Sequence, residues 1–277
     1  MSRADAIARA TRYFDNGTFR DDLARRVAIP TESQNSERAP VLVDYLETEM
    51  TPALRRLGFD CRILTERGWP FLFAERQENP ARPTVLGYGH GDVIRGLDEG
   101  WGEGLSPWRL TERGDRWYGR GVADNKGQHS INLASLAAVL ETRGTLGFNA
   151  KYLIEMGEEM GSPGLRELCT REKELLRADV LIGSDGPRLT ADRPTVFLGS
   201  RGGVSFDMWI DAREGGHHSG NWGGLLSDPA IQLAHAIASV VGPTGQIRVR
   251  EWVPTEIPAN VRRVLADCEI DSGGEGP

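Results

Sequence analysis

Cysteine is scarce in this chain. Cys61, Cys169 and Cys268 are the three cysteines among 277 residues, and they lie far apart with no CxxC pair. This spacing argues against both a disulfide framework and a zinc-ribbon site. We interpret the three thiols as buried, small hydrophobic side chains in a reducing compartment, and we therefore expect a cytoplasmic protein.

Long apolar runs are also missing. No run of about 18 apolar residues occurs, and the first 14 residues contain no apolar core, so we expect neither a membrane span nor a signal peptide. The net charge is −7, with acidic and basic residues interleaved, which disfavours nucleic acid and anionic membranes as partners. The GxxxxGK[ST] and HExxH motifs are absent, and GYGHGD lacks the GxGxxG spacing, which disfavours nucleotide binding and HExxH-type proteolysis.

Apolar segments with strand-like and helix-like spacing alternate along the first 200 residues. The apolar patterns predict helices over residues 7–14, 41–57, 126–140 and 165–176, and strands over residues 71–74, 84–88, 151–155 and 180–182. Pro52 interrupts the second helix, and Gly58 is expected to end it. This order predicts an α/β fold with a mostly parallel sheet and helices on both faces.

A change in the residue pattern near residue 200 predicts a domain boundary. We expect a second unit in which a strand over residues 204–210 precedes a glycine-rich loop and a helix over 229–241. A short strand rich in Arg and Val and a helix near 260–268 follow. The expected organisation is therefore one domain over 1–200 and a smaller α+β domain over 201–277.

Chemistry-bearing residues follow successive apolar strands and are set among glycines. They are His90 with Asp92, Asp124 before a helix, the pair Glu158 and Glu159, and Asp185. Singly, each has an ordinary structural interpretation: a hydrogen-bonded imidazole, a helix N-cap, or a solvated surface pair. Together they indicate a metal site, because the carboxyl ends of parallel strands meet at one edge of a sheet.

Imidazole and carboxylate ligands without thiolates favour zinc, cobalt or manganese. Asp92 lies two residues after His90, where its carboxylate can orient the imidazole for a metal. Of the adjacent glutamates, one can bind metal while the other takes a proton from water. Two metals about 3.5–4 Å apart would share a bridging carboxylate, a role that suits Asp124.

Five motifs in this order carry a family resemblance: GHGDV, GRGVADNKGQ, EMGEEMGS, GSDG and GGHHSGNWGG. Between about residues 25 and 245 the chain resembles the di-zinc metallopeptidase family of aminoacylase, carnosinase, carboxypeptidase G and succinyl-diaminopimelate desuccinylase. The resemblance implies that His90 and Asp185 bind one metal, Glu159 the other, and Asp124 both. It also implies that Asp92 orients His90 and Glu158 is the general base.

The resemblance implies two further features. The peptide bond between Asp124 and Asn125 is expected to be cis, and His218 in the GGHHSG loop is expected to polarise the scissile carbonyl from a lid, or dimerisation, domain. This lid implies a homodimer. His129 and His235 are interpreted as structural residues.

In the family pattern, a histidine far towards the C-terminus completes the second metal site, and no histidine follows His235 here. We therefore expect an incomplete catalytic domain over 1–200 and a partial lid over 201–277. The expected function is metal-dependent hydrolysis of amide bonds in dipeptides or N-acyl amino acids. The alternative is a catalytically silent truncated fragment that binds metal or a partner subunit.

Overall fold

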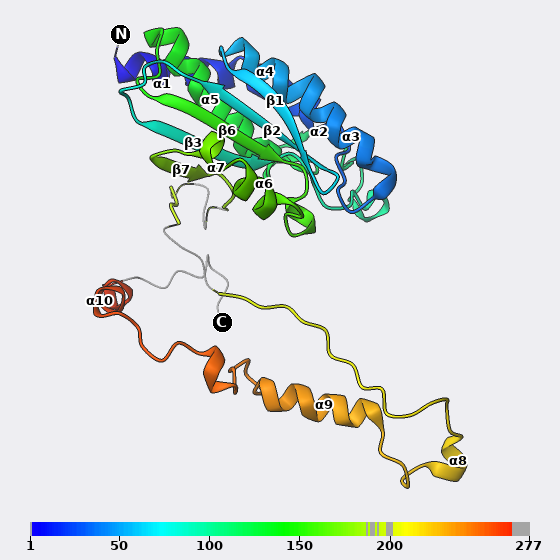
Figure 1. Ribbon diagram of the computed structural model, residues 1–277. Helices are drawn as coiled ribbons and strands as arrows, with labels where there is room; N and C mark the ends of the chain where they lie inside the picture. Colours follow the sequence, from blue (N-terminus) through cyan, green and yellow to red (C-terminus); the bar gives the residue numbers. More distant parts are fainter. Residues whose placement is uncertain (1, 187, 189–191, 193, 198–201, 268–277) are drawn as a thin grey trace. The chain divides into compact units, whose positions relative to one another are not determined.

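The structure is a computed structural model that describes residues 2–186, 188, 192, 194–197 and 202–267 (Figure 1). The chain divides into two compact units, Met1–Gly186 and Pro187–Pro277. The predicted assignment of a catalytic role to residues 1–200 and a lid role to 201–277 stays a prediction.

A five-stranded sheet forms the centre of the first unit. Its strands, in spatial order, are β1 (Asp60–Glu66), β2 (Trp69–Arg76), β6 (Asn149–Glu155), β3 (Thr84–His90) and β7 (Val180–Gly183). β2 pairs antiparallel with β1 and β6, whereas β3 pairs parallel with β6 and β7. Four strands therefore run in one direction and only β2 opposes them, which confirms the predicted mostly parallel sheet.

Helices cover both faces of this sheet, as predicted. Alternate residues of β2 and β6 point to opposite faces, so Leu72 and Ile154 join one core cluster while Phe71 and Leu153 join another. The first cluster packs against α3 (Ala39–Tyr45), α4 (Thr51–Arg56) and α5 (Lys126–Arg143), and the second packs against α6 (Leu165–Arg171). Burial on both faces explains why β2 and β6 read as nearly continuous apolar runs.

The predicted helix over residues 41–57 forms in three parts. The π-helical segment η2 (Leu46–Met50) joins α3 to α4, and Pro52, which has no backbone N–H to donate, lies just after it in the first turn of α4. Gly58 follows with φ of +78°, the left-handed conformation expected of a glycine after a helix end. The predicted helix over 165–176 is likewise split, into α6 and α7 (Lys173–Leu176).

The remaining elements of the first unit are short or lie at its margins. They are α1 (Arg3–Asp15), α2 (Thr18–Val27), η1 (Ser36–Arg38), η3 (Asp98–Gly100), β4 (Thr111–Arg113), β5 (Arg116–Tyr118) and η4 (Glu158–Met160). β4 and β5 form a two-stranded antiparallel hairpin within the long connection from β3 to α5.

The second unit contains helices where its residues are described. They are α8 (Ser219–Trp222), α9 (Pro229–Val240), η5 (Arg250–Trp252) and α10 (Ala259–Asp267). The predicted strand over residues 204–210 is wrong, since that segment has neither strand pairing nor helix. A strand needs a neighbour for its N–H and C=O groups, and among residues 202–267 the only pairing is the isolated bridge between Val241 and Ile247.

Cys61 and Cys169 are free thiols, and Cys268 lies outside the described residues. The predicted burial is wrong for both described cysteines, since Cys61 is partly exposed and Cys169 is exposed. Among the described helices, none combines the length and hydropathy needed to cross a membrane.

Candidate metal centre

The site lies at the carboxyl-terminal edge of three parallel strands. His90 is the last residue of β3, and β3 lies between β6 and β7 in the sheet. Glu158 follows β6 at the start of η4, and Asp185 follows β7 by two residues. The central strand therefore supplies the imidazole, and the two flanking strands supply a carboxylate on each side.

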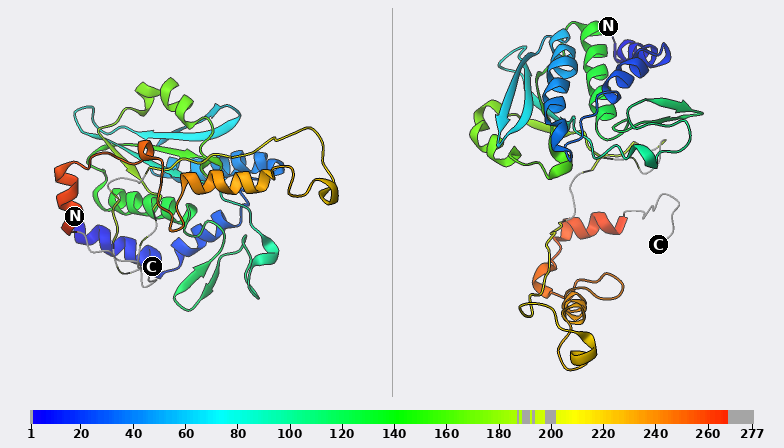
Figure 2. Two further views of the ribbon diagram at one scale, coloured as in Figure 1. Left: turned by 90° about the horizontal axis from the view of Figure 1, so that it is seen from below. Right: turned by 90° about the vertical axis from the view of Figure 1, so that its right-hand side faces the viewer.

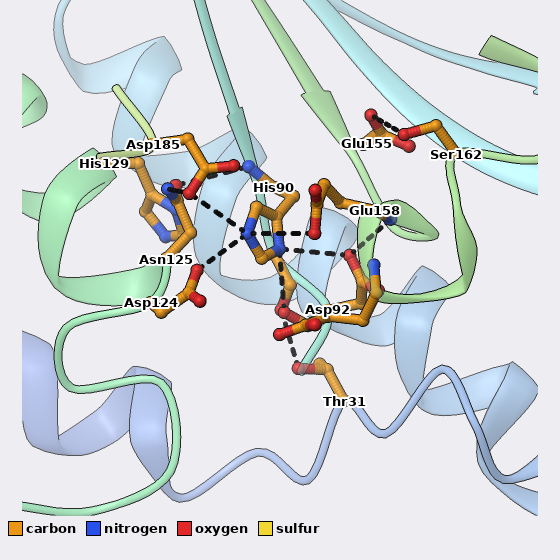
Figure 3. Close-up of polar contacts among 12 residues, drawn as sticks. Thr31, His90, Asp92, Asp124, Asn125, His129, Glu155, Glu158, Ser162 and Asp185 are labelled. Atoms are coloured by element: carbon orange, nitrogen blue, oxygen red, sulfur yellow. Dashed lines mark hydrogen bonds and ion pairs between the residues drawn. The ribbon is translucent and has the colours of Figure 1, made fainter. Parts of the chain in front are cut away.

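Three carboxylates surround the Nε2 atom of His90 (Figure 3). Asp124 Oδ1 lies 3.0 Å from Nε2, and Glu158 Oε2 and Asp185 Oδ1 each lie 3.8 Å from it. The His90 side chain is fully buried, whereas those of Asp124, Glu158 and Asp185 are 64%, 36% and 30% exposed. The imidazole thus forms the floor of a site whose carboxylates open to solvent.

The opposite ring nitrogen of His90 faces Asp92. Nδ1 lies 3.1 Å from the backbone oxygen of Asp92 and 3.3 Å from its Oδ1. The buried Asp92 carboxylate also accepts the backbone N–H groups of Glu158 and Glu159, each at 3.2 Å. Asp92 therefore links the orientation of the imidazole to the position of the η4 turn.

Asn125 connects the elements of the site, a role that the sequence analysis missed. Its Oδ1 accepts the backbone N–H of His90 at 3.3 Å, and its Nδ2 donates to the Ser184 oxygen at 2.5 Å and to Asp185 Oδ1 at 3.3 Å. An Asn directly before a helix usually indicates a side-chain N-cap, but this one makes no capping bond to α5. The peptide bond from Asp124 to Asn125 is cis, which confirms the expectation from the resemblance.

The protonation of these groups follows from their packing. Burial opposes a charge on His90, but hydrogen bonds to Asp124, Asp185 and Asp92 outweigh it and raise the pKa of the imidazole to about 12. Burial, reinforced by neighbouring carboxylates, raises the pKa of Glu158 and of Glu159, whereas the hydrogen bond to His90 lowers the pKa of Asp185. The cluster of carboxylates therefore stabilises positive charge at its centre. A divalent cation would supply that charge, as the proton on His90 does.

The donor atoms fit a small divalent cation. One ligand atom each from His90, Glu158 and Asp185 lie within 4.8 Å of one another. Zinc bonds of about 2.0–2.2 Å in a tetrahedral site separate the ligand atoms by about 3.4 Å. The distances from His90 Nε2 to Asp124, Glu158 and Asp185, which are 3.0 Å, 3.8 Å and 3.8 Å, lie on either side of that value.

Glu158 and Glu159 have different contacts. Glu158 places a carboxylate oxygen beside His90 Nε2. Glu159 is linked to the site through its backbone N–H, which donates to the Asp92 carboxylate. Gly157, which starts the turn, leaves no room for a side chain, since a Cβ there would lie 2.9 Å from the Trp69 ring. The assignment of Glu159 as metal ligand and Glu158 as base stays a prediction.

His218 belongs to the second unit, at the N-cap of α8. Its Nδ1 accepts the backbone N–H of Gly220 at 3.1 Å, which leaves Nε2 to carry the hydrogen of the neutral imidazole. His217 instead packs edge-on against Trp222. The expected role of His218 at the scissile carbonyl stays a prediction.

The motifs at these strand ends coincide with a known family pattern. Residues 86–275 match the pattern of peptidase family M20/M25/M40. The chain belongs to this family. Human Beta-Ala-His dipeptidase is 35% identical over 233 residues, which are 83% of this chain and 44% of that protein. The Cysteinylglycine-S-conjugate dipeptidase of Corynebacterium striatum is 37% identical over 203 residues, 72% of this chain and 44% of that protein.

Solved M20 structures share the fold. Human carnosine dipeptidase 1 superposes with a TM-score of 0.68 at 26% identity, over 95% of this chain and 59% of that chain. The di-peptidase Dug1p from Saccharomyces cerevisiae gives a TM-score of 0.75 at 21% identity, over 96% of this chain and 59% of that chain. The chain spans less than half the length of the first curated M20 relatives that it matches.

Proposed function

We propose that this chain carries the catalytic centre of a metal-dependent dipeptidase that binds two divalent cations. His90 and Asp185 would hold one ion, Glu159 would hold the other, and Asp124 would be shared by both. Zinc is the preferred ion, with cobalt or manganese as alternatives. The convergence of His90, Asp124, Glu158 and Asp185 at one sheet edge is the observation that carries this proposal.

Glu158 is the proposed general base. Its carboxylate is half-buried beside the imidazole of His90, and burial raises its pKa towards the range in which a carboxylate accepts and returns a proton efficiently. When bound, the divalent cations lower the pKa of water and polarise a carbonyl group. Glu158 Oε2 then takes a proton from the attacking water and delivers it to the nitrogen of the leaving amine.

His218 is the proposed donor to the carbonyl oxygen. With Nδ1 engaged by Gly220, its Nε2–H is free to stabilise the negative charge that develops on that oxygen. Substitution of His218 by Ala should lower turnover about 10²–10³-fold without changing metal content. An unchanged turnover would contradict the role.

The substrate class comes from the family relatives. Two relatives carry the names of a Beta-Ala-His dipeptidase and a Cysteinylglycine-S-conjugate dipeptidase, so we propose a short dipeptide as substrate. N-acyl amino acids present the same arrangement of an amide beside a free carboxylate and form the second group to test. The cytoplasmic location and the homodimer through the second unit stay predictions.

The experiment compares the Glu158→Gln and Glu103→Gln variants. Glu103 is exposed in the loop between β3 and α5. The zinc-loaded chain is assayed on β-Ala-His, Cys-Gly and N-acetyl amino acids, and its metal content is measured in the same samples. We expect Glu158→Gln to lower turnover about 10²–10⁴-fold with metal retained, and Glu103→Gln to leave both unchanged. Loss of metal together with activity in Glu158→Gln would identify Glu158 as a ligand instead.

A further inference from the structure

A cavity lies among the helices that cover one face of the first unit. It measures about 490 Å³ and is bordered by residues of α1, α2, α4 and α5. Figure 2 shows the N-terminal helices beside α5, in agreement with the packing of α1 and α2 on it. None of its lining residues belongs to the metal centre. Its volume falls within the range of about 300–1,000 Å³ typical of small-molecule sites.

Arg26 lines this cavity as a buried cation with few partners. Its side chain is 4% exposed, and one guanidinium nitrogen donates to the neutral hydroxyl of Ser130 at 2.6 Å. Its Nε has no hydrogen-bond partner, and the nearest carboxylate, Glu49, lies 3.9 Å away and already accepts two hydrogen bonds from Arg25. A buried charge is costly unless it is paired, so the guanidinium group of Arg26 favours an anionic partner inside the cavity.

Other charges around the cavity leave an excess of positive charge. Arg9 pairs with Glu141, and Asp22 is engaged by Arg25. The two other lining cations, Arg12 and Arg56, make no side-chain hydrogen bond or ion pair with any residue that the structure describes.

The cavity is also partly apolar. Leu57 and Leu133, with alanines of α4 and α5, contribute to its lining. A molecule that fits it therefore combines an anionic group for the arginines with an apolar part for these side chains.

We propose that this cavity binds a small organic anion, a carboxylate or a phosphate monoester attached to an apolar group. Arg26 binds the anionic group from within the cavity, and Arg12 and Arg56 bind it from the rim. Phosphates and carboxylates share the planar, bidentate recognition that guanidinium groups provide.

Calorimetric titration of the whole chain tests this proposal. The protein is treated with EDTA first, so that no metal-bound anion contributes, and it is titrated with phenyl phosphate, benzoate and neutral benzyl alcohol. We expect at least one of the two anions to bind about tenfold or more tightly than benzyl alcohol. The anion that binds more tightly identifies the preferred group, and equal affinities indicate recognition of their shared charge.

Surface variants locate the binding. Arg12→Gln and Arg56→Gln should each weaken anion binding about tenfold, the effect of one lost charge-assisted hydrogen bond. Arg55→Gln is the matched control, because Arg55 is an exposed neighbour on α4 that does not line the cavity. Absence of anion binding, equal binding of benzyl alcohol, or an equal loss in Arg55→Gln would overturn the proposal. These variants alter exposed side chains, so a folding defect is not expected.

Discussion

Asp92 Oδ1 lies 3.3 Å from Nδ1 of His90, and both side chains are fully buried. The same carboxylate accepts the backbone N–H groups of Glu158 and Glu159. The Asp92 side chain thus fixes both the imidazole of His90 on β3 and the turn that follows the neighbouring strand β6. The orientation of His90 therefore depends on Asp92, although Asp92 is not one of the carboxylates that surround Nε2.

Substitution of Asp92 by Asn tests this relationship. An amide cannot accept all three hydrogen bonds, and its NH₂ group would face a backbone N–H or the imidazole N–H. We expect zinc affinity to fall about 10–100-fold, as is typical when the partner of a metal-binding histidine is lost. Competitive zinc titration measures the change, with Asp115→Asn in the exposed β4–β5 turn as the control. Wild-type affinity in Asp92→Asn would contradict the positioning role.

The sequence predicted the parallel core of the sheet and, with it, the meeting of His90, Glu158 and Asp185 at one edge, whereas Asp124 lies in the turn before α5 and follows no strand of the sheet. The strands β3, β6 and β7 coincide with predicted apolar runs. Because these strands are parallel, their carboxyl ends bring His90, Glu158 and Asp185 to one edge of the sheet. β1 was not predicted, because this edge strand has no fully buried residue and therefore little apolar signal. The connecting role of Asn125 depends on hydrogen bonds across three segments, which no local pattern encodes.

The wrong strand over residues 204–210 has a related cause. Its apolar and β-branched composition satisfies the strand pattern, but strand formation also requires a partner. The split at Glu172 likewise escapes the sequence, since the apolar spacing continues across it. Local pattern therefore predicted the long buried elements and failed where pairing or packing decides.

Gly127 in the first turn of α5 is predicted to be essential for the loop that carries Asp124. A Cβ at Gly127 would lie 1.8 Å from the Val122 oxygen, so the loop would have to move. We expect Gly127→Ala to lower zinc affinity at least about tenfold or to lower the yield of folded protein. Gly183→Ala is the control, because a Cβ there meets no atom within 4 Å. Equal zinc affinity and equal yield in the two variants would contradict the prediction.

Glu78 is predicted to stabilise the first unit in a pH-dependent manner. Burial favours its neutral form, but hydrogen bonds from Thr145, Leu146 and Gly147 outweigh it and lower the pKa from 4.5 to about 2. The folded pKa is depressed, so the stabilisation is fully present above about pH 4.5 and is lost as the pH falls towards 2.

Urea unfolding followed by circular dichroism measures this effect. Glu78→Gln should lower the free energy of unfolding by on the order of 2 kcal/mol at pH 7, and the difference from wild type should shrink at pH 3. Glu174→Gln, whose side chain is 83% exposed, is the control and should change little. A difference for Glu78→Gln that is independent of pH would assign its effect to packing alone.

Zinc content of the purified chain tests the central claim, that the strand-end residues form a metal centre. The EDTA-treated protein is reloaded with zinc, dialysed and analysed for bound metal, together with His90→Ala and the control His235→Ala in α9. The account predicts at least one zinc ion per wild-type chain, the same content in His235→Ala, and a clear loss in His90→Ala. Absence of bound zinc in the wild-type chain, or equal zinc content in His90→Ala and wild type, would contradict it.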